Sequence, residues 1–499
     1  MMAGQGCWRN RVLLRAWVSC CVVMWAFGVV GLQTQATSSA SERRQALEDH
    51  LCRYIVLRGA GDATMTLAGQ MATLHVPAVS LAAIRGGRID WAQAYGVMSL
   101  GGPPATTKTL FQAASISKAV TAVGVLKLVQ DGKIDPDADV NQYLKRWKIP
   151  DNAFTATRRV TVRELLNHTS GIGTHNGEIY DPSQPLPTLL DMLNGVKPAR
   201  TAPVRVEAVP GTKFAYSNGG YLVLYLLIED VTGDPFAHYM QHAVLDPIGM
   251  KDSTFEAPLP DKWARRAATS YGDGTKGTPP EKFLEPNLAA GGLWTTPTDL
   301  AKFLIEMQRE DAGTSDKVLD REMAQAMLTP DDHLVEARRW GLGIEVGGTS
   351  SDPYMRHEGS AYFQDDMIAY LHGSGIVVMT SGGGGGTLAE EILRSAASVY
   401  DFPDFRPQER TAVELESATL PSYVGTYGFV IVALGHGFLT AEIPAGAPPA
   451  RLYAESPTHF FVLDGPQELS FHLDGQGRVT GLDFITPMGR HSLPKNTEK

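Results

Sequence analysis

The chain has 499 residues, 43% of them hydrophobic, so it is long enough to bury a large core and to hold two domains. Its formal net charge is −10 and it has no run of lysines and arginines, so we expect no nucleic-acid partner. Three of its four cysteines lie in the first 21 residues and only Cys52 follows them. This count predicts neither a disulfide framework nor a thiolate metal site.

The N-terminus has the pattern of a secretory signal. Arginines precede an almost wholly apolar run, Ala16 to Leu32, and small and polar residues follow it. We predict a cleaved signal peptide over residues 1–36 and a secreted or periplasmic protein. The alternative is an uncleaved anchor, because the run approaches the ~17 residues that a spanning helix needs. Membrane contact is expected only in that case.

The next stretch predicts a helical region followed by a hairpin. Residues 41–74 are expected to be helical, with a break at residues 59–62. Two β-rich runs, Pro77 to Ile84 and Ile89 to Tyr95, flank a turn that contains Gly86 and Gly87. Such a pair of runs around a short glycine turn is typical of a β-hairpin.

Two reactive side chains open the apolar helix that follows. Ser115 and Lys118 precede a hydrophobic run to Val129, and the helix is expected to end near Gly132. Residues at i and i+3 share one helix face, so the Lys118 amine should lie beside the Ser115 hydroxyl. A serine needs a base before it can attack, and a helix N-terminus offers free N–H groups to an oxyanion. Ser115 is therefore our candidate nucleophile.

The middle of the chain adds polar residues at helix ends. Residues 160–171 predict a short helix ended by glycine, and His168 near its end is either a catalytic base or a helix cap, of which we favour the cap. Tyr216 to Asn218 stand at the entrance of an apolar helix, Tyr221 to Val231. Thr296 is expected to cap a further helix whose first turn contains Asp299.

Strands dominate the later part. We expect them at Trp340 to Val346, Met367 to His372 and Ile376 to Thr380, with Arg356 to Ser360 between the first two. The glycine run 382–386 lacks the residues of a phosphate loop and is interpreted as a flexible connection. A linker, residues 401–412, then separates a domain at 41–400 from a small all-β domain at 413–495, a barrel or sandwich.

Three motifs occur in a characteristic order: Ser115 to Lys118, Tyr216 to Asn218, and His357 to Gly359. They resemble the motifs of the serine β-lactamase-related family, in the class C-like branch that includes D-alanyl-D-alanine carboxypeptidases and family VIII esterases. Residues 165–171 and 290–293 also resemble the family, over about residues 45–400 in all. The region from Tyr423 resembles the lipocalin-like β-domains appended to some of these hydrolases.

The resemblance implies an α+β fold, with an antiparallel sheet flanked by helices and a helical lobe. It also implies a role for each motif residue. Ser115 would attack the carbonyl, Lys118 would help to take its proton, and Tyr216 would act as base and then protonate the leaving group. Asn218 would orient Lys118 and the substrate. His357 and Gly359 would line the substrate side, and the N–H groups of Ser115 and Ser360 would form the oxyanion hole.

The expected function is that of an exported serine hydrolase, which acts through a Ser115 acyl-enzyme on an ester, an amide or a β-lactam. His357 stands where a lysine is common, so carboxylate-bearing substrates should be held less firmly. The alternatives are a D-alanyl-D-alanine carboxypeptidase and a low-turnover penicillin-binding-like protein. The chain has no Gly-x-Ser-x-Gly elbow, which disfavours an α/β-hydrolase. We expect a small-molecule or peptide substrate and neither a cofactor nor a metal.

Overall fold

The computed structural model describes residues 38–59, 65–173, 178–272, 276–330, 339–445, 449–487 and 489–496. The predicted signal peptide, residues 1–36, lies outside the described residues. Within the described parts of the chain, no helix is both long and apolar enough to cross a membrane. The chain divides into two units, Met1–Ser39 and Ala40–Lys499, and the second contains every element discussed below.

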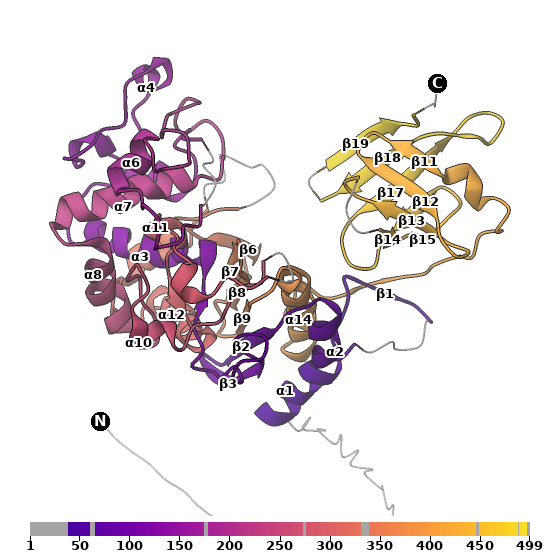
Figure 1. The fold of residues 1–499 in the computed structure, drawn as a ribbon, viewed down its shortest axis with the longest axis horizontal. Coiled ribbons are helices and arrows are strands. Elements are labelled where there is room, and N and C mark those ends of the chain that lie inside the picture. Colours follow the sequence, from indigo (N-terminus) through magenta and orange to yellow (C-terminus); the bar gives the residue numbers. More distant parts are fainter. Residues whose placement is uncertain are drawn as a thin grey trace, which may run out of the picture. The chain divides into compact units, whose positions relative to one another are not determined.

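A six-stranded sheet forms the centre of the first domain (Figure 1). All of its neighbouring strands are antiparallel. In sheet order they are β3 (Arg88–Gly96), β2 (Ala78–Arg85), β9 (Gly375–Thr380), β8 (Gln364–Tyr370), β7 (Asp352–Ser360) and β6 (Glu345–Thr349). The predicted hairpin is confirmed as β2 and β3. The strand expected at residues 340–346 begins later, and β7 was not predicted as a strand.

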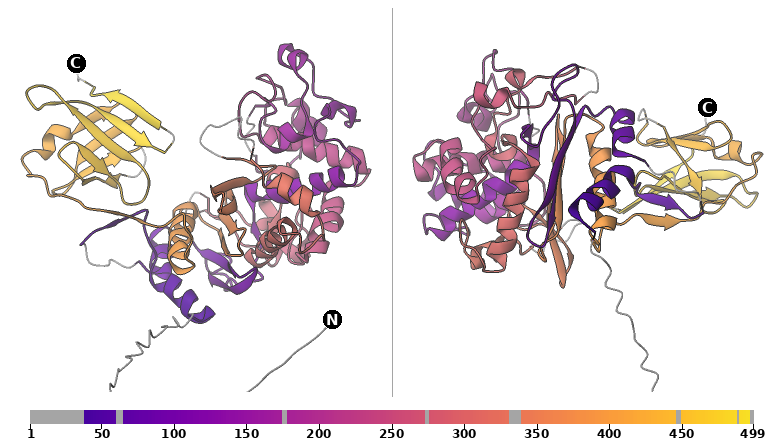
Figure 2. Two further views of the ribbon diagram at one scale, coloured as in Figure 1. Left: turned by 180° about the vertical axis from the view of Figure 1, so that it is seen from behind. Right: turned by 90° about the horizontal axis from the view of Figure 1, so that it is seen from below.

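Both faces of this sheet are covered, because successive side chains of a strand point to opposite faces. In β2, Ala78 and Ala82 belong to one hydrophobic core, whereas Val79 and Leu81 belong to another. Helix α12 (Pro297–Asp311) packs on one face, and α14 (Gly385–Val399) packs on the other. The edge-on view in Figure 2 shows helices on each side of the sheet.

Most of the helices lie on the α12 side, where they build the lobe that carries the first two predicted motifs, whereas the third lies on β7. They are α3 (Ser117–Gln130), α4 (Ala153–Thr157), α5 (Val162–Leu166), α6 (Leu189–Asn194), α7 (Asn218–Thr232), α8 (Phe236–Met240), α9 (Asp246–Ile248), α10 (Asp261–Ala264), α11 (Leu288–Gly291) and α13 (Arg321–Met327). Thr296 caps α12 through the Asp299 N–H, as predicted.

The N-terminal region contains a strand that was not expected in the helical stretch at residues 41–74, and most of the break expected at residues 59–62 lies outside the described residues. It forms α1 (Ala40–Asp49), β1 (Ile55–Leu57) and α2 (Leu67–Thr73), and β1 pairs in parallel with β10 (Gln408–Arg410). The short strand is specified by a partner more than 350 residues away, which a local pattern cannot reveal. A further two-stranded sheet joins β4 (Phe111–Gln112) to β5 (Trp294–Thr295).

The glycine run before α14 is a packed turn and not the flexible connection that we expected. A Cβ at Gly384 would collide with the carbonyl oxygen of Leu74. The glycines therefore permit close approach of two backbones at the start of α14, which is one of the reasons for glycine in such turns.

The C-terminal region is all-β, as predicted, with its own hydrophobic core. One sheet contains β11 (Gly425–Tyr427), β12 (Val430–Leu434), β13 (Leu439–Glu442) and β14 (Ala450–Arg451). The other contains β15 (Tyr453–Ala454), β16 (His459–Phe461), β17 (Glu468–Leu473), β18 (Val479–Thr486) and β19 (Gly489–Pro494). An isolated bridge between Tyr427 and Lys495 joins β11 of the first sheet to the residue after β19 of the second. The lipocalin-like resemblance stays a prediction.

Candidate active site

The candidate nucleophile lies on a strained turn. Strand β4 ends at Gln112, and a 3-10 turn, Ala114–Ile116, carries Ser115 into helix α3. Ala114 has φ 43°, a left-handed value that is uncommon for a residue with a side chain. Its N–H donates to Oε1 of Gln112 at 3.1 Å, which holds the turn in place. Backbone strain of this kind clusters at active sites.

Lys118 contacts Ser115, as the i, i+3 spacing predicted. The Lys118 side chain is completely buried, and its Nζ lies 3.0 Å from Oγ of Ser115. The same Nζ donates to the carbonyl oxygen of Ala290 at 3.0 Å. A buried amine needs such partners because burial without them is costly. Lys118 is therefore fixed against the Ser115 hydroxyl.

Tyr216 lies on the other side of Lys118. The Nζ atom of Lys118 is 4.9 Å from the centre of the Tyr216 ring, a cation–π distance. Among the described residues, the Tyr216 hydroxyl makes no hydrogen bond to Ser115. Ser217 fixes the loop that carries Tyr216, because its Oγ caps α7 through the N–H of Gly220 at 3.0 Å. The structure thus brings Tyr216 to Lys118 and not directly to the nucleophile.

The backbone of His168 helps to end helix α5, as expected of a cap, because the N–H of Thr169 after it donates to the carbonyl oxygen of Glu164 at 2.9 Å, but its side chain has another role. His168 follows α5 with φ 62°, is only 1% exposed, and its Nδ1 accepts the N–H of Ser217 at 3.1 Å. Its ring centre lies 4.3 Å from that of Tyr216. Burial, followed by the charges of Lys118 and His357, lowers the pKa of His168 well below 6.5, so the ring is neutral. His168 therefore supports the Tyr216 loop.

His357, Gly359 and Ser360 lie on β7, the strand that packs on the Ser115 turn. A Cβ at Gly359 would collide with the carbonyl oxygen of Ala113, so glycine is required for this approach. The ring of His357 contacts Trp340, with ring centres 5.4 Å apart, and Trp340 contacts Tyr216 at 5.9 Å. Trp340 is a site residue that the motifs did not indicate.

A cavity of about 540 Å³ opens beside the nucleophile. Ser115, Asn218 and Ser360 are among its lining residues. Of the described residues that were predicted as site members, four do not line it: Lys118, Tyr216, His357 and Gly359. The arrangement can present a carbonyl to Ser115 while Lys118 contacts the hydroxyl from the protein side. Ser115, on the 3-10 turn, and Ser360, on β7, line the same cavity from two elements.

Glu285 also lines this cavity, and no motif pointed to it. Its Oε1 accepts the N–H of Asn287 at 3.0 Å, at the N-cap of α11. Burial raises the pKa of Glu285 to about 7, with the Asn287 hydrogen bond and the charge of Lys118 acting against that rise. Because Glu285 precedes a four-residue helix in a loop, only the folded structure brings it to Ser115.

The profile of the Beta-lactamase family matches residues 44–401. The chain belongs to the Beta-lactamase family. The chain is 28% identical over 338 residues to penicillin-binding protein 4 of Amycolatopsis lactamdurans, covering 64% of this chain and 84% of that protein. It is also 26% identical over 286 residues to Protein flp of Staphylococcus aureus (strain MW2). That alignment covers 56% of this chain and 52%, about half, of Protein flp.

The fold is shared with an octameric penicillin-binding protein homologue from Pyrococcus abyssi. That structure aligns with a TM-score of 0.57 and 21% identity, over 86% of this chain and 98% of its own. The chain is therefore a Beta-lactamase-family hydrolase related to penicillin-binding proteins. The predicted fold class, a sheet flanked by helices with a helical lobe and a C-terminal all-β region, is confirmed.

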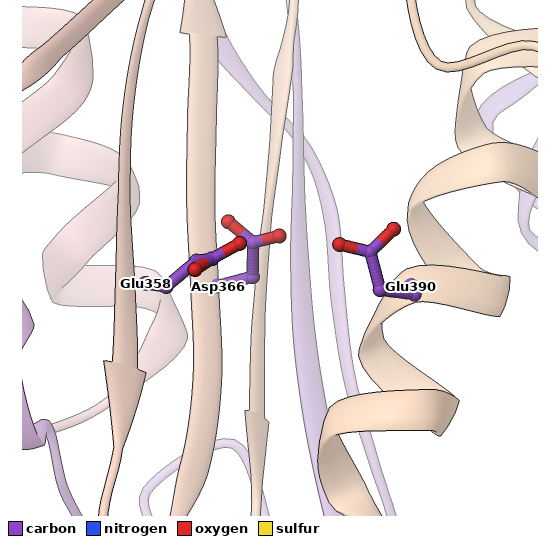
Figure 3. A group of neighbouring side chains, drawn as sticks. All are labelled: Glu358, Asp366 and Glu390. Atoms are coloured by element: carbon purple, nitrogen blue, oxygen red, sulfur yellow. The ribbon is translucent and has the colours of Figure 1, made fainter. Parts of the chain in front are cut away.

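One group of carboxylates in this Beta-lactamase-family domain has the spacing of a metal site. Glu358 on β7, Asp366 on β8 and Glu390 on α14 point toward a common space (Figure 3). The guanidinium of Arg356 occupies that space, with Nη2 at 2.6 Å from Asp366 and 2.9 Å from each glutamate. The group is therefore an ion-pair network between the sheet and α14, and Arg356 provides the charge that a cation would supply.

Proposed function

We propose that the chain is an exported serine hydrolase that forms an acyl-enzyme at Ser115. The observation that carries this proposal is the 3.0 Å contact between Nζ of Lys118 and Oγ of Ser115 at the wall of a cavity. A serine hydroxyl attacks only when a base takes its proton, and Lys118 is the ionisable group within hydrogen-bond distance. Export is supported by the apolar run from Ala16 to Leu32.

The proposed reaction has two stages. The Ser115 oxygen bonds to the substrate carbonyl carbon while its proton passes to the neutral amine of Lys118, which becomes an ammonium. The carbonyl oxygen becomes an oxyanion held by the N–H groups of Ser115 and Ser360. The intermediate then collapses, and the leaving group departs with the proton. Water releases the acyl group by the same route. Tyr216 contributes to the reaction through Lys118, because its ring faces the positive charge that Lys118 acquires when it takes the proton.

The proposed substrates are esters, amides and β-lactams, which share a carbonyl that a serine can attack. The relation to penicillin-binding protein 4 of Amycolatopsis lactamdurans favours a second candidate, a D-alanyl-D-alanine carboxypeptidase or penicillin-binding-like protein with slow release. A 4-nitrophenyl ester, a chromogenic cephalosporin and a D-Ala-D-Ala peptide, assayed side by side, separate these functions. Fast acylation with slow release on the cephalosporin indicates the penicillin-binding type, whereas rapid ester turnover indicates an esterase.

A further inference from the structure

The cavity wall beside Ser115 carries negative charge. Among its lining residues in the described parts of the chain, the charged side chains are Glu178 and Glu285, and no lysine, arginine or histidine is present. The buried Nζ of Lys118 is not part of this wall and contacts Ser115 and Ala290. A substrate carboxylate in the cavity would therefore meet two carboxylates and no cation, whereas a cationic group would be attracted.

The two glutamates differ in their partners. Glu178 is already paired with Arg200, with 3.3 Å between Nη2 and Oε2. Glu285 has no basic side chain within ion-pair distance among the described residues. Within the described parts of the chain, its carboxylate accepts one hydrogen bond, from the Asn287 N–H to Oε1 at 3.0 Å. The carboxyl is thus half-buried, held in place by this bond, and without a basic side chain in contact among the described residues.

A partly buried carboxylate without an ion-pair partner binds a positively charged ligand group more strongly than a neutral one. An ammonium group donates up to three hydrogen bonds and would supply the missing countercharge. Charged neighbours of Glu285 are Lys118, on α3, and Glu178, before Tyr180. Lys118 is engaged by Ser115 and Ala290, so it does not neutralise Glu285 by contact.

We propose that Glu285 is a specificity residue that binds a positively charged amine of the substrate while Ser115 attacks the carbonyl. This inference rests on the proposed function and narrows its substrate class to amine-bearing esters or amides. It also explains why the site needs no lysine at position 357, since no substrate carboxylate has to be held. Glu178 contributes less to binding the amine, because it is already paired with Arg200.

Matched esters test the inference directly. The probes are 4-nitrophenyl esters of ω-amino acids from 3-aminopropanoate to 6-aminohexanoate, each paired with the alkanoate in which a methyl group replaces the ammonium. The wild-type protein should show a higher kcat/KM for the amine of at least one pair. In Glu285→Gln, which keeps an acceptor for the Asn287 N–H, the ratio of amine to methyl kcat/KM should fall about tenfold or more, mainly through KM.

Two variants serve as controls. Glu178→Gln should lower the ratio by a smaller factor, and Glu281→Gln, an exposed neighbour outside the cavity, should leave it at the wild-type value. An equal loss on both esters of a pair in Glu285→Gln would show a merely structural role and overturn the inference. A wild-type ratio near one at every chain length would also overturn it, and the proposed hydrolase would stand if the methyl esters were still hydrolysed through Ser115.

The pH dependence of the wild-type ratio gives a second measurement that needs no folded variant. The pKa of Glu285 is about 7, and the carboxyl is neutral below that value. The ω-amine stays charged to about pH 10, so the ratio should rise as the pH increases through about 7. Lys118 and Tyr216 act on the carbonyl that both esters share, so their effects cancel in the ratio. A flat ratio overturns the inference, and hydrolysis of no ester at any pH overturns the proposed function as well.

Discussion

Replacement of His168 by phenylalanine should destabilise the protein and slow catalysis together. Phenylalanine keeps a flat ring beside Tyr216 but removes the Nδ1 acceptor, which leaves the N–H of Ser217 buried without a partner. An unpaired buried N–H costs about 1–3 kcal/mol in the free energy of unfolding. Because Ser217 caps α7 and adjoins Tyr216, we expect kcat for a nitrophenyl ester to fall about 10-fold to 100-fold with little change in KM.

The pH dependence of the free energy of unfolding provides a second test of His168. His168 titrates well below 6.5 in the folded protein and near 6.5 in the unfolded chain, so the unfolded state binds the extra proton in between. The free energy of unfolding of the wild-type protein should therefore fall by up to about 1.4 kcal/mol per pH unit as the pH decreases below 6.5. In His168→Phe this contribution to the pH dependence should be absent. Urea unfolding between pH 7 and pH 5 measures the difference.

His238→Phe, which changes an exposed histidine, is the matched control. It should leave the free energy of unfolding within about 0.5 kcal/mol of wild type. If His168→Phe kept the wild-type kcat, or showed the wild-type slope of stability against pH, the support of the Tyr216 loop by His168 would be refuted.

Three further predictions concern β7. Ser360→Pro removes an oxyanion N–H and should lower kcat about 10²-fold to 10³-fold, whereas Ser360→Ala keeps that N–H and should lower it far less; equal losses would exclude this N–H from the site. Arg356→Met leaves Asp366 without its cation partner, so it should lower the free energy of unfolding by about 3–5 kcal/mol at pH 8. The loss should be smaller at pH 5, where the Asp366 carboxyl, whose pKa is raised to about 7 by burial, is protonated, as urea unfolding will test. His357→Lys should raise the rate of acylation by a cephalosporin relative to a short-chain ester, and an unchanged ratio would show that position 357 does not set carboxylate preference.

The local sequence predicted the contact between Ser115 and Lys118 but not the residues that line the cavity beside them. Ser115 and Lys118 are three residues apart, so their contact follows from helix geometry. Glu285 reaches the same cavity through a loop distant in sequence, and no local spacing encodes that approach.

Strand β7 escaped prediction for a related reason. Its consecutive residues Arg356, His357 and Glu358 break the apolar alternation that marks a strand. In the structure Arg356 enters an ion-pair network and His357 packs on Trp340, so polar side chains occupy positions that usually hold apolar ones. The cap at His168 followed from its place after a helix, but the partner of its side chain lies in a loop nearly 50 residues later, which local sequence cannot indicate.

Intact-protein mass spectrometry after brief reaction with an activated ester or a cephalosporin tests the central claim most directly. The account predicts a mass increase equal to the acyl group, located on Ser115 by peptide mapping, and its absence in a folded Ser115→Ala variant that also lacks turnover. Acylation of another residue, or full turnover by Ser115→Ala, would contradict the account.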